Sequence, residues 1–227
     1  MSEESKAVVE VAKTTGKAVD AARELGGFLS KYVGGSLEQA MGIFEDKLKY
    51  LRWERQVRLI ERAGHFLNKR GLQEPSRNVP LHVAIPLIQG GSLEEDNSLQ
   101  DRWAALLVNA ADASSSVEVR RAFVSILEDL TPLDALLFQK IYSIPVAPET
   151  DAEIWTTHLP DSATTKKPET ENARPLAYVE VSLGNLERLG LLNSAIAWGG
   201  MASSSCVYRT SLGHEFQKAI SLAEHSS

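Results

Sequence analysis

Cysteine is almost absent from this chain of 227 residues, because Cys206 is its only one. A single cysteine cannot form an internal disulfide, and it fits a protein of a reducing compartment. The first residues, Met-Ser-Glu-Glu-Ser-Lys, lack the basic start and the apolar run of a secretory signal. These absences predict a cytoplasmic protein.

Long apolar segments are also missing. The longest window without a charged residue extends from Leu189 to Tyr208, and glycine, asparagine and serine fill much of it. A transmembrane helix needs about 20 mostly apolar residues, whereas this composition is typical of strands and a turn. We therefore expect no membrane span, with a peripheral contact to the inner membrane as an alternative to a purely cytoplasmic location.

The motifs of common enzyme chemistry are not present. The five histidines are scattered, at positions 65, 82, 158, 214 and 225, and no two have the short spacing of metal ligands. Ser203 to Cys206 offer nucleophiles without a Gly-x-Ser-x-Gly elbow, and the Gly-Gly pairs match no nucleotide-binding loop. The sequence predicts a protein that is not an enzyme, with no catalytic residue, no bound metal and no cofactor.

Proline does not occur before Pro75, so the first part of the chain can be helical over long stretches. Thr15, Gly26, Leu37 and Leu48 are eleven residues apart, which places them in one stripe along a helix. This pattern predicts an amphipathic helical arm over residues 1–75, either continuous or broken at its Gly-Gly pairs. Its small apolar face favours self-association, and contact with a membrane interface is the alternative.

A basic segment follows within that arm. Between Lys47 and Arg70 there are eight lysines and arginines and two acids, so the segment carries +6 and the remainder of the chain −12, out of a total of −6. Four of these residues lie opposite the apolar seam of the same predicted helix: Arg52, Arg55, Arg58 and Arg62. This face is either solvated, docked on the protein's own acidic segments, or a contact for a partner, a lipid headgroup or a phosphate.

The middle of the chain, residues 79–143, reads as a helical core. Ser92 and Glu95 form a Ser-x-x-Glu pattern that predicts a capping box for the next helix. That helix contains Trp103, whose spacing from its leucine neighbours indicates a core anchor rather than a partner-binding hot spot. Thr131-Pro132-Leu133-Asp134 predicts the start of a later helix, with Thr131 as its N-cap.

Five of the nine prolines lie between Pro145 and Pro175, and we interpret residues 144–175 as an exposed connection anchored by Ile154, Trp155 and Leu159. Residues 176–227 then predict a helix, two strands around a glycine- and serine-rich turn, and a closing helix. This is the order of a winged helix. The expected fold is therefore mainly α, with a helical arm and bundle followed by a winged-helix-like α+β unit that carries a small β-hairpin.

Three segments resemble the abortive-infection alpha (Abi-alpha) family of bacterial proteins. They are Ser92-Leu-Glu-Glu-Asp-Asn-Ser-Leu-Gln-Asp-Arg-Trp-Ala-Ala-Leu-Leu-Val-Asn-Ala, Ile126-Leu-Glu-Asp-Leu-Thr-Pro-Leu-Asp-Ala, and Leu183-Gly-Asn-Leu-Glu-Arg-Leu-Gly-Leu-Leu followed by Tyr208-Arg-Thr-Ser-Leu-Gly-His-Glu-Phe. With gaps they span residues 79–220, and the segment around Trp103 is the most specific. The resemblance implies a bacterial anti-phage role and supplies no catalytic residues.

Two functional hypotheses follow. The first is a non-enzymatic abortive-infection protein that binds a host or phage protein or perturbs a membrane. The alternative is a winged-helix transcriptional regulator that binds DNA. Nucleic acid is the less favoured partner, because the predicted recognition helix offers only Asn185 and Arg188 and the wing has no lysine or arginine before Arg209.

Overall fold

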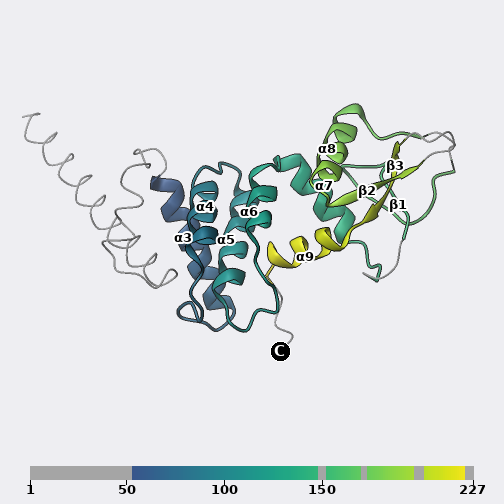
Figure 1. Ribbon diagram of the computed structural model, residues 1–227. Coiled ribbons are helices and arrows are strands. Elements are labelled where there is room, and N and C mark those ends of the chain that lie inside the picture. Colours follow the sequence, from purple (N-terminus) through teal and green to yellow (C-terminus); the bar gives the residue numbers. More distant parts are fainter. Residues whose placement is uncertain (1–52, 148–151, 170–172, 197–201, 223–227) are drawn as a thin grey trace, which may run out of the picture. The chain divides into compact units, whose positions relative to one another are not determined.

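The computed structural model describes residues 53–147, 152–169, 173–196 and 202–222 (Figure 1). Within these ranges the protein is mainly helical, with a small three-stranded antiparallel sheet in its C-terminal part, which confirms the predicted fold class. The predicted stripe of the arm, residues 6–48, and Arg52 lie outside the described residues. Contacts divide the chain into two compact units, one up to Ser116 and one from Val117.

The described part of the first unit contains three helices, α3 (Trp53–Lys69), α4 (Leu81–Gly91) and α5 (Asn97–Ala111), each of which packs against the other two. Helix α5 lies at the centre, since almost every residue from Leu99 to Ala111 is buried. Helix α3 contributes an apolar face containing Leu59, Ala63 and Leu67. It ends at Lys69, and Gly71 follows with a φ of 73°, which only glycine adopts easily. Leu72 N donates to Leu67 O and closes the C-terminal cap.

Helix α4 is an apolar segment that continues through Pro86 and through Gly90-Gly91. Both glycines are buried against α5 or α3, and their lack of a side chain is a packing requirement. A Cβ atom at Gly90 would lie 2.5 Å from Cη2 of Trp103, and one at Gly91 would lie 2.8 Å from a methyl carbon of Leu59. The two glycines therefore let α4 approach Trp103 and Leu59 closely.

The second unit contains α6 (Arg121–Glu128), α7 (Pro132–Tyr142), β1 (Ile154–Trp155), α8 (Ala177–Arg188), β2 (Leu192–Ile196), β3 (Ala202–Arg209) and α9 (Ser211–Ala219). Its helical core is built around three phenylalanine rings from different helices. Phe216 lies 5.8 Å from Phe123 and 5.5 Å from Phe138, measured between ring centroids. Contacts of this kind join α6, α7 and α9 at spacings favourable for aromatic pairs.

The sheet has the strand order β1-β3-β2, with all pairs antiparallel. Strand β1 was not predicted as a strand, although Ile154 and Leu159 are buried anchors as the sequence indicated. Strand β3 begins at Ala202, so residues placed in the predicted turn belong to the hairpin, and the pairing with β2 shifts register between Ser194 and Ala195. Helix α8, this hairpin and α9 follow in the predicted order; the classification as a winged helix stays a prediction.

Candidate functional site

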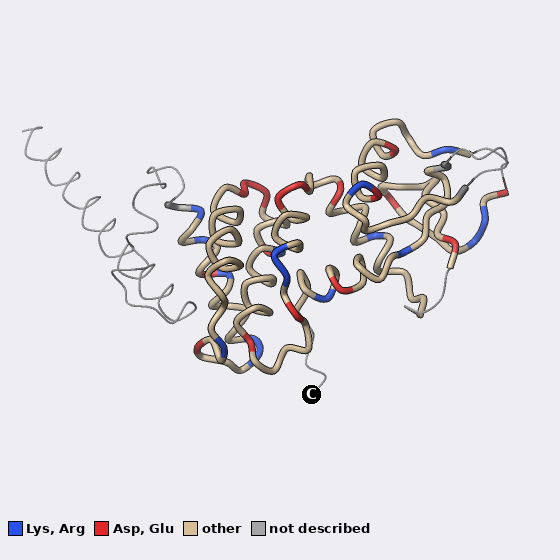
Figure 2. The backbone as a smooth tube through the Cα atoms, viewed as in Figure 1, with Lys and Arg blue, Asp and Glu red and all other residues tan. Residues whose placement is uncertain are grey.

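Three residues of the predicted arginine face, Arg55, Arg58 and Arg62, lie on α3, and Arg55 and Arg62 are directed toward the start of α5. Figure 2 shows basic positions along α3 and acidic positions at the turn between α4 and α5, where Glu94, Glu95 and Asp96 follow one another. Arg55 donates from Nη2 to the Glu95 carboxylate and from Nη1 to Leu93 O at 3.3 Å. This residue of the predicted site therefore binds the α4–α5 turn of its own unit.

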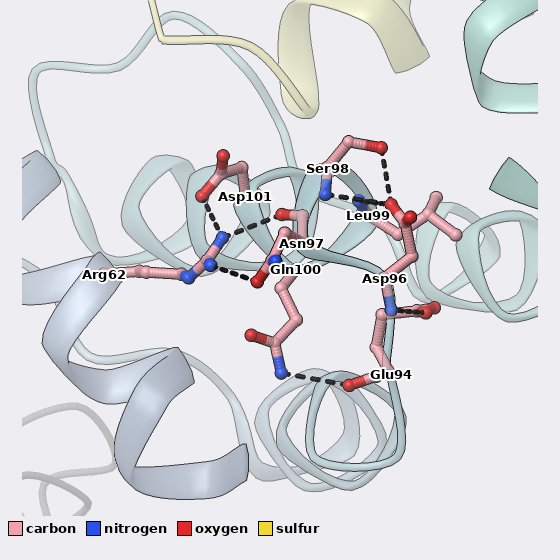
Figure 3. A network of polar contacts seen from close by, with 8 residues as sticks. All are labelled: Arg62, Glu94, Asp96, Asn97, Ser98, Leu99, Gln100 and Asp101. Carbon is pink, nitrogen blue, oxygen red and sulfur yellow. Dashed lines mark hydrogen bonds and ion pairs between the residues drawn. The ribbon is translucent and has the colours of Figure 1, made fainter.

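Arg62 holds the first turn of α5 in the same way (Figure 3). Its Nη1 donates to the backbone oxygen of Asn97 at 2.7 Å and to the Asp101 carboxylate, and its Nη2 donates to Oδ1 of Asn97 at 2.7 Å. Arg58 is half-buried on the same helix and also takes part in an interaction. Docking on the protein's own acidic segment is thus what the structure shows for Arg55 and Arg62, and any other contact of theirs stays a prediction.

Asp96 is the N-cap of α5, which corrects the predicted capping box. Its carboxylate accepts from Ser98 N at 2.9 Å and from Leu99 N at 3.0 Å (Figure 3). The hydrogen bond from the Ser98 hydroxyl, with that from Leu99 N, lowers the pKa of Asp96. Ser92 instead ends α4 and donates to Gln89 O. The prediction was wrong because five residues separate the helices, and aspartate is as good an N-cap as serine.

A second polar cluster joins the C-terminal ends of α3 and α5. The Arg70 guanidinium donates to the Asp112 carboxylate at 2.9 Å and to Oδ1 of Asn109 at 2.6 Å, and all three side chains are nearly excluded from solvent. Burial alone would raise the pKa of Asp112, but the hydrogen bonds from Ser114 and from Arg70 outweigh it and lower that pKa. This buried ion pair holds the unit together at the end opposite to Arg55.

Trp103 lies in the core between α4, α5 and α3 and is 1% exposed. Its ring packs on Gly90 and its Cβ faces Gly91. The indole Nε1 has no hydrogen-bond partner in the described part of the chain, and Gln56 Nε2 and Gln100 Oε1 share that property. Because the ring is buried inside its own unit, its placement is that of a core anchor.

Helix α8 has an outward face of a different character. The N-cap residue Leu176 is 57% exposed, Tyr178 is 51% exposed and Val181 is 74% exposed. These are the largest exposed fractions among the large apolar side chains of the described residues. Its opposite face is buried through Val179, Leu183 and Leu186 against α7 and the hairpin. This surface was not identified from the sequence; Pro175, which favours an extended residue before a new helix, was the available signal.

Three polar residues in the C-terminal half of α8 bind other parts of their own unit. Asn185 Nδ2 donates to Asp129 O and to the Asp134 carboxylate, both at 3.0 Å, and Arg188 Nη2 donates to the Asp129 carboxylate at 2.9 Å. Glu187 accepts from both the backbone and the hydroxyl of Ser194 on β2. The two residues that the sequence offered for base contacts thus bind Asp129 at the end of α6 and, for Asn185, also Asp134 in the first turn of α7.

Tyr142 joins α7 to the hairpin and α9. Its hydroxyl donates to Leu191 O at 2.6 Å and accepts from Thr210 N at 3.2 Å, while Arg209 lies over its ring and His214 meets the ring edge. Burial raises the pKa of Tyr142. Desolvation, together with the positive charges of Arg209 and Lys218, lowers the pKa of His214. Both shifts favour the neutral forms of Tyr142 and His214, which pack beside the Arg209 guanidinium.

The groups weighed for catalysis lie apart. Cys206 is buried in β3, and its burial, together with the Glu153 carboxylate, raises the pKa of the thiol to about 11. In the described ranges there is no group of three or more histidine, cysteine and acidic side chains that could hold a metal ion. None of the helices described combines the length and the apolar character needed to cross a bilayer.

Comparison with known proteins gives one result. The family model described as abortive infection alpha matches residues 54–220, which span both compact units. No curated protein and no solved structure matches the chain.

Proposed function

Because the chain belongs to the abortive infection alpha family, we propose that it defends a bacterial host against phage by abortive infection, through binding to a protein rather than by enzymatic catalysis. The observation that carries the binding mode is the outward face of α8. Tyr178 and Val181 are one helical turn apart on α8, Leu176 immediately precedes the helix, and all three expose half or more of their surface. Exposed large apolar side chains at this density are typical of protein interaction sites.

The alternative, a DNA-binding regulator, has less support from the same helix. A recognition helix reads bases with polar side chains that project into the major groove. Here Asn185 and Arg188 are bound to Asp129 and, for Asn185, also to Asp134. The most exposed residues of the helix include the apolar Tyr178 and Val181, which favour contact with another protein surface.

The first unit would then serve as a scaffold. Arg55 and Arg62 secure the α4–α5 turn, and the Arg70–Asp112 pair secures the other ends of α3 and α5. The arginine surface remains a second candidate contact. Its ion pairs at Arg55 and Arg62 are partly exposed, and pairs of that kind contribute only about 0–1 kcal/mol, so a multivalent anionic partner could displace them.

A phage-plating assay tests the proposal. The host would carry the wild type, Val181→Glu, a quadruple variant with Arg52, Arg55, Arg58 and Arg62 changed to glutamine, or Leu81→Glu as a control. Leu81 on α4 is 48% exposed, so it controls for adding a carboxylate at an exposed apolar position. We expect Val181→Glu to lose protection and Leu81→Glu to keep it. Full protection by Val181→Glu at normal protein level would contradict the role of α8.

Two further results bear on the assignment. A broad phage panel that is not restricted by the wild type would count against the defence role itself. A titration with duplex DNA at low salt, where phosphate contacts are strongest, is expected to show no binding. Measurable affinity that falls steeply with salt would favour the regulator instead.

A further inference from the structure

We propose that the α8 face binds the α8 face of a second copy of this chain, in an antiparallel pair about a two-fold axis near Gly184. This inference rests on the proposed role of α8 as a protein contact, and it names the partner. In a two-fold interface the same patch serves both copies, so it must be complementary to itself. Three properties of α8 satisfy that requirement.

The first is the distribution of charge along the helix. Its first turn carries Glu180 and its last turn carries Arg188. The third charged residue of the helix, Glu187, is occupied by the hydrogen bonds from Ser194. Glu180 and Arg188 are each four residues from Gly184, on either side. With a rise of about 1.5 Å per residue, an antiparallel partner helix centred on Gly184 brings Glu180 of each copy level with Arg188 of the other.

The antiparallel arrangement also places the positive end of each helix dipole beside the negative end of the other. A parallel arrangement would set Glu180 beside Glu180 and Arg188 beside Arg188. Arg188 remains 59% exposed despite its bond to Asp129, so its guanidinium is accessible for a second acceptor.

The second property is room for close approach. Gly184 is exposed in the middle of the outward face, and a Cβ atom there would meet nothing within 4 Å. With no side chain at the axis, the two backbones can come to the short end of the usual distance between packed helices, about 8 Å. Val181, one turn earlier, then packs against the flank of the partner helix instead of facing solvent.

The third property is a matching apolar group at the opposite end. Gly190 follows α8, and a Cβ atom there would lie 3.2 Å from a methyl carbon of Leu212, so Leu212 marks the C-terminal end of the helix. Leu212 is itself among the exposed large apolar side chains. Tyr178 and Gly190 are each six residues from Gly184. The antiparallel pair therefore brings the Tyr178 end of one copy onto the Leu212 end of the other.

Light scattering on the full-length chain is the primary test. We expect a dimeric mass for the wild type and for Leu81→Glu, and a monomeric mass for Val181→Glu, whose circular dichroism should match that of the wild type. A monomeric wild type at concentrations of tens of micromolar would overturn the proposal. So would a dimer that Val181→Glu leaves intact, because self-association would then use another surface, such as the predicted arm.

A cysteine at the axis gives an independent readout. Cys206 is buried and its thiol is largely protonated at neutral pH, so Gly184→Cys introduces the one accessible thiol of the described residues. Under mild oxidation by diamide, two thiols at the axis lose two electrons and join as a disulfide, giving a covalent dimer on a non-reducing gel. The same change at Gly64, a half-buried position of α3 with open space around its Cα, is the control. Equal cross-linking of both variants would overturn the antiparallel pairing.

The outcome is distinguishable from that of the proposed function. If Val181→Glu loses phage protection while the wild type is a monomer, the α8 face contacts a different protein and only the present inference fails. If the dimer is lost and protection is retained, the second copy is bound for another purpose and the proposed role of α8 in defence fails.

Discussion

At the scale of single residues, the most consequential feature of the first unit is a buried charge. Asp112 and Arg70 expose 2% and 6% of their side chains, and the pair is completed by Asn109. A buried ion has lost its hydration, so the folded state depends on the counter-charge of its partner. Arg62 and Asp101 form a pair of the same chemistry at a more exposed position.

The two pairs predict different costs of truncation. Asp112→Ala leaves the Arg70 guanidinium buried without a counter-charge, and we expect it to lower the free energy of unfolding by about 3–5 kcal/mol. Asp101→Ala should cost about 0–1 kcal/mol, because solvent can replace the lost carboxylate. Urea titration followed by circular dichroism measures both. Equal losses for the two variants would contradict the assignment of Asp112 as the buried partner.

His214 predicts a dependence of stability on pH. Burial and the charges of Arg209 and Lys218 lower its pKa in the folded protein, and Glu215 opposes them only in part. Between its ordinary pKa near 6.5 and the lower folded value, the unfolded chain binds a proton that the folded chain does not. The contribution of His214 to the free energy of unfolding is therefore fully present above about pH 6.5, and it is lost as the pH falls below that value.

The measurement is the urea midpoint at pH 7.5 and at pH 5.5. His214→Gln should show a smaller decrease between these two values than the wild type, because the imidazole that resists protonation is gone. The same substitution at the exposed His65 controls for losing a histidine elsewhere. A wild-type decrease that His214→Gln leaves unchanged would assign the pH dependence to other groups.

At the scale of elements, helix ends and apolar spacing were predictable and close contacts were not. Thr131 caps α7 as the four residues Thr131 to Asp134 predicted, and the structure adds that Asp134 completes a capping box. Local chemistry of this kind is contained in the sequence. The N-cap of α5 was misplaced because Ser92 and Asp96 are both good caps, and the choice depends on how far α4 continues. Strand β1 is only two residues long and is defined by its pairing with β3, which no local pattern reveals.

In the candidate site, too, the local pattern was predictable and the contacts were not. The sequence located the arginine face of α3 but could not say that Arg55 and Arg62 point to the start of α5, since the partners are about 40 residues away. Likewise Tyr178 and Val181 are ordinary helix residues in the sequence. Only their placement opposite the buried Val179 and Leu183 shows that they face outward.

The contact between α4 and α5 gives a prediction for two glycines. A methyl group at Gly90 would overlap the Trp103 ring, so Gly90→Ala should destabilise the protein by about 1–3 kcal/mol. Gly64 lies inside α3 with open space around it, and Gly64→Ala should stabilise by up to about 1 kcal/mol through helix propensity. Thermal unfolding of the two variants measures opposite shifts. A neutral Gly90→Ala would mean that α4 can move away from Trp103 at little cost.

At the scale of the whole molecule, the division between Ser116 and Val117 could not be found by composition, because it falls inside the predicted helical core 79–143. The predicted domain ranges followed proline content, whereas the units follow which helices share a core. The second unit has its own aromatic core of Phe123, Phe138 and Phe216 and its own sheet. The hydrogen bonds that join the Tyr142 hydroxyl to Leu191 and to Thr210 also lie within this unit.

These features predict that residues 117–227 fold without the first unit. A chain of this length can bury a sufficient core by itself, since domains of about 60 residues already do so. We expect the fragment to unfold in a single cooperative transition, with dispersed amide signals in its NMR spectrum. Phe216→Ala, which removes a ring that meets both Phe123 and Phe138, should abolish that transition or lower its midpoint strongly, because such truncations cost about 3–5 kcal/mol. A fragment that is soluble but shows no cooperative transition would mean that the second unit depends on the first. Because α8 lies entirely within this fragment, a folded fragment should also form the same dimer as the full chain.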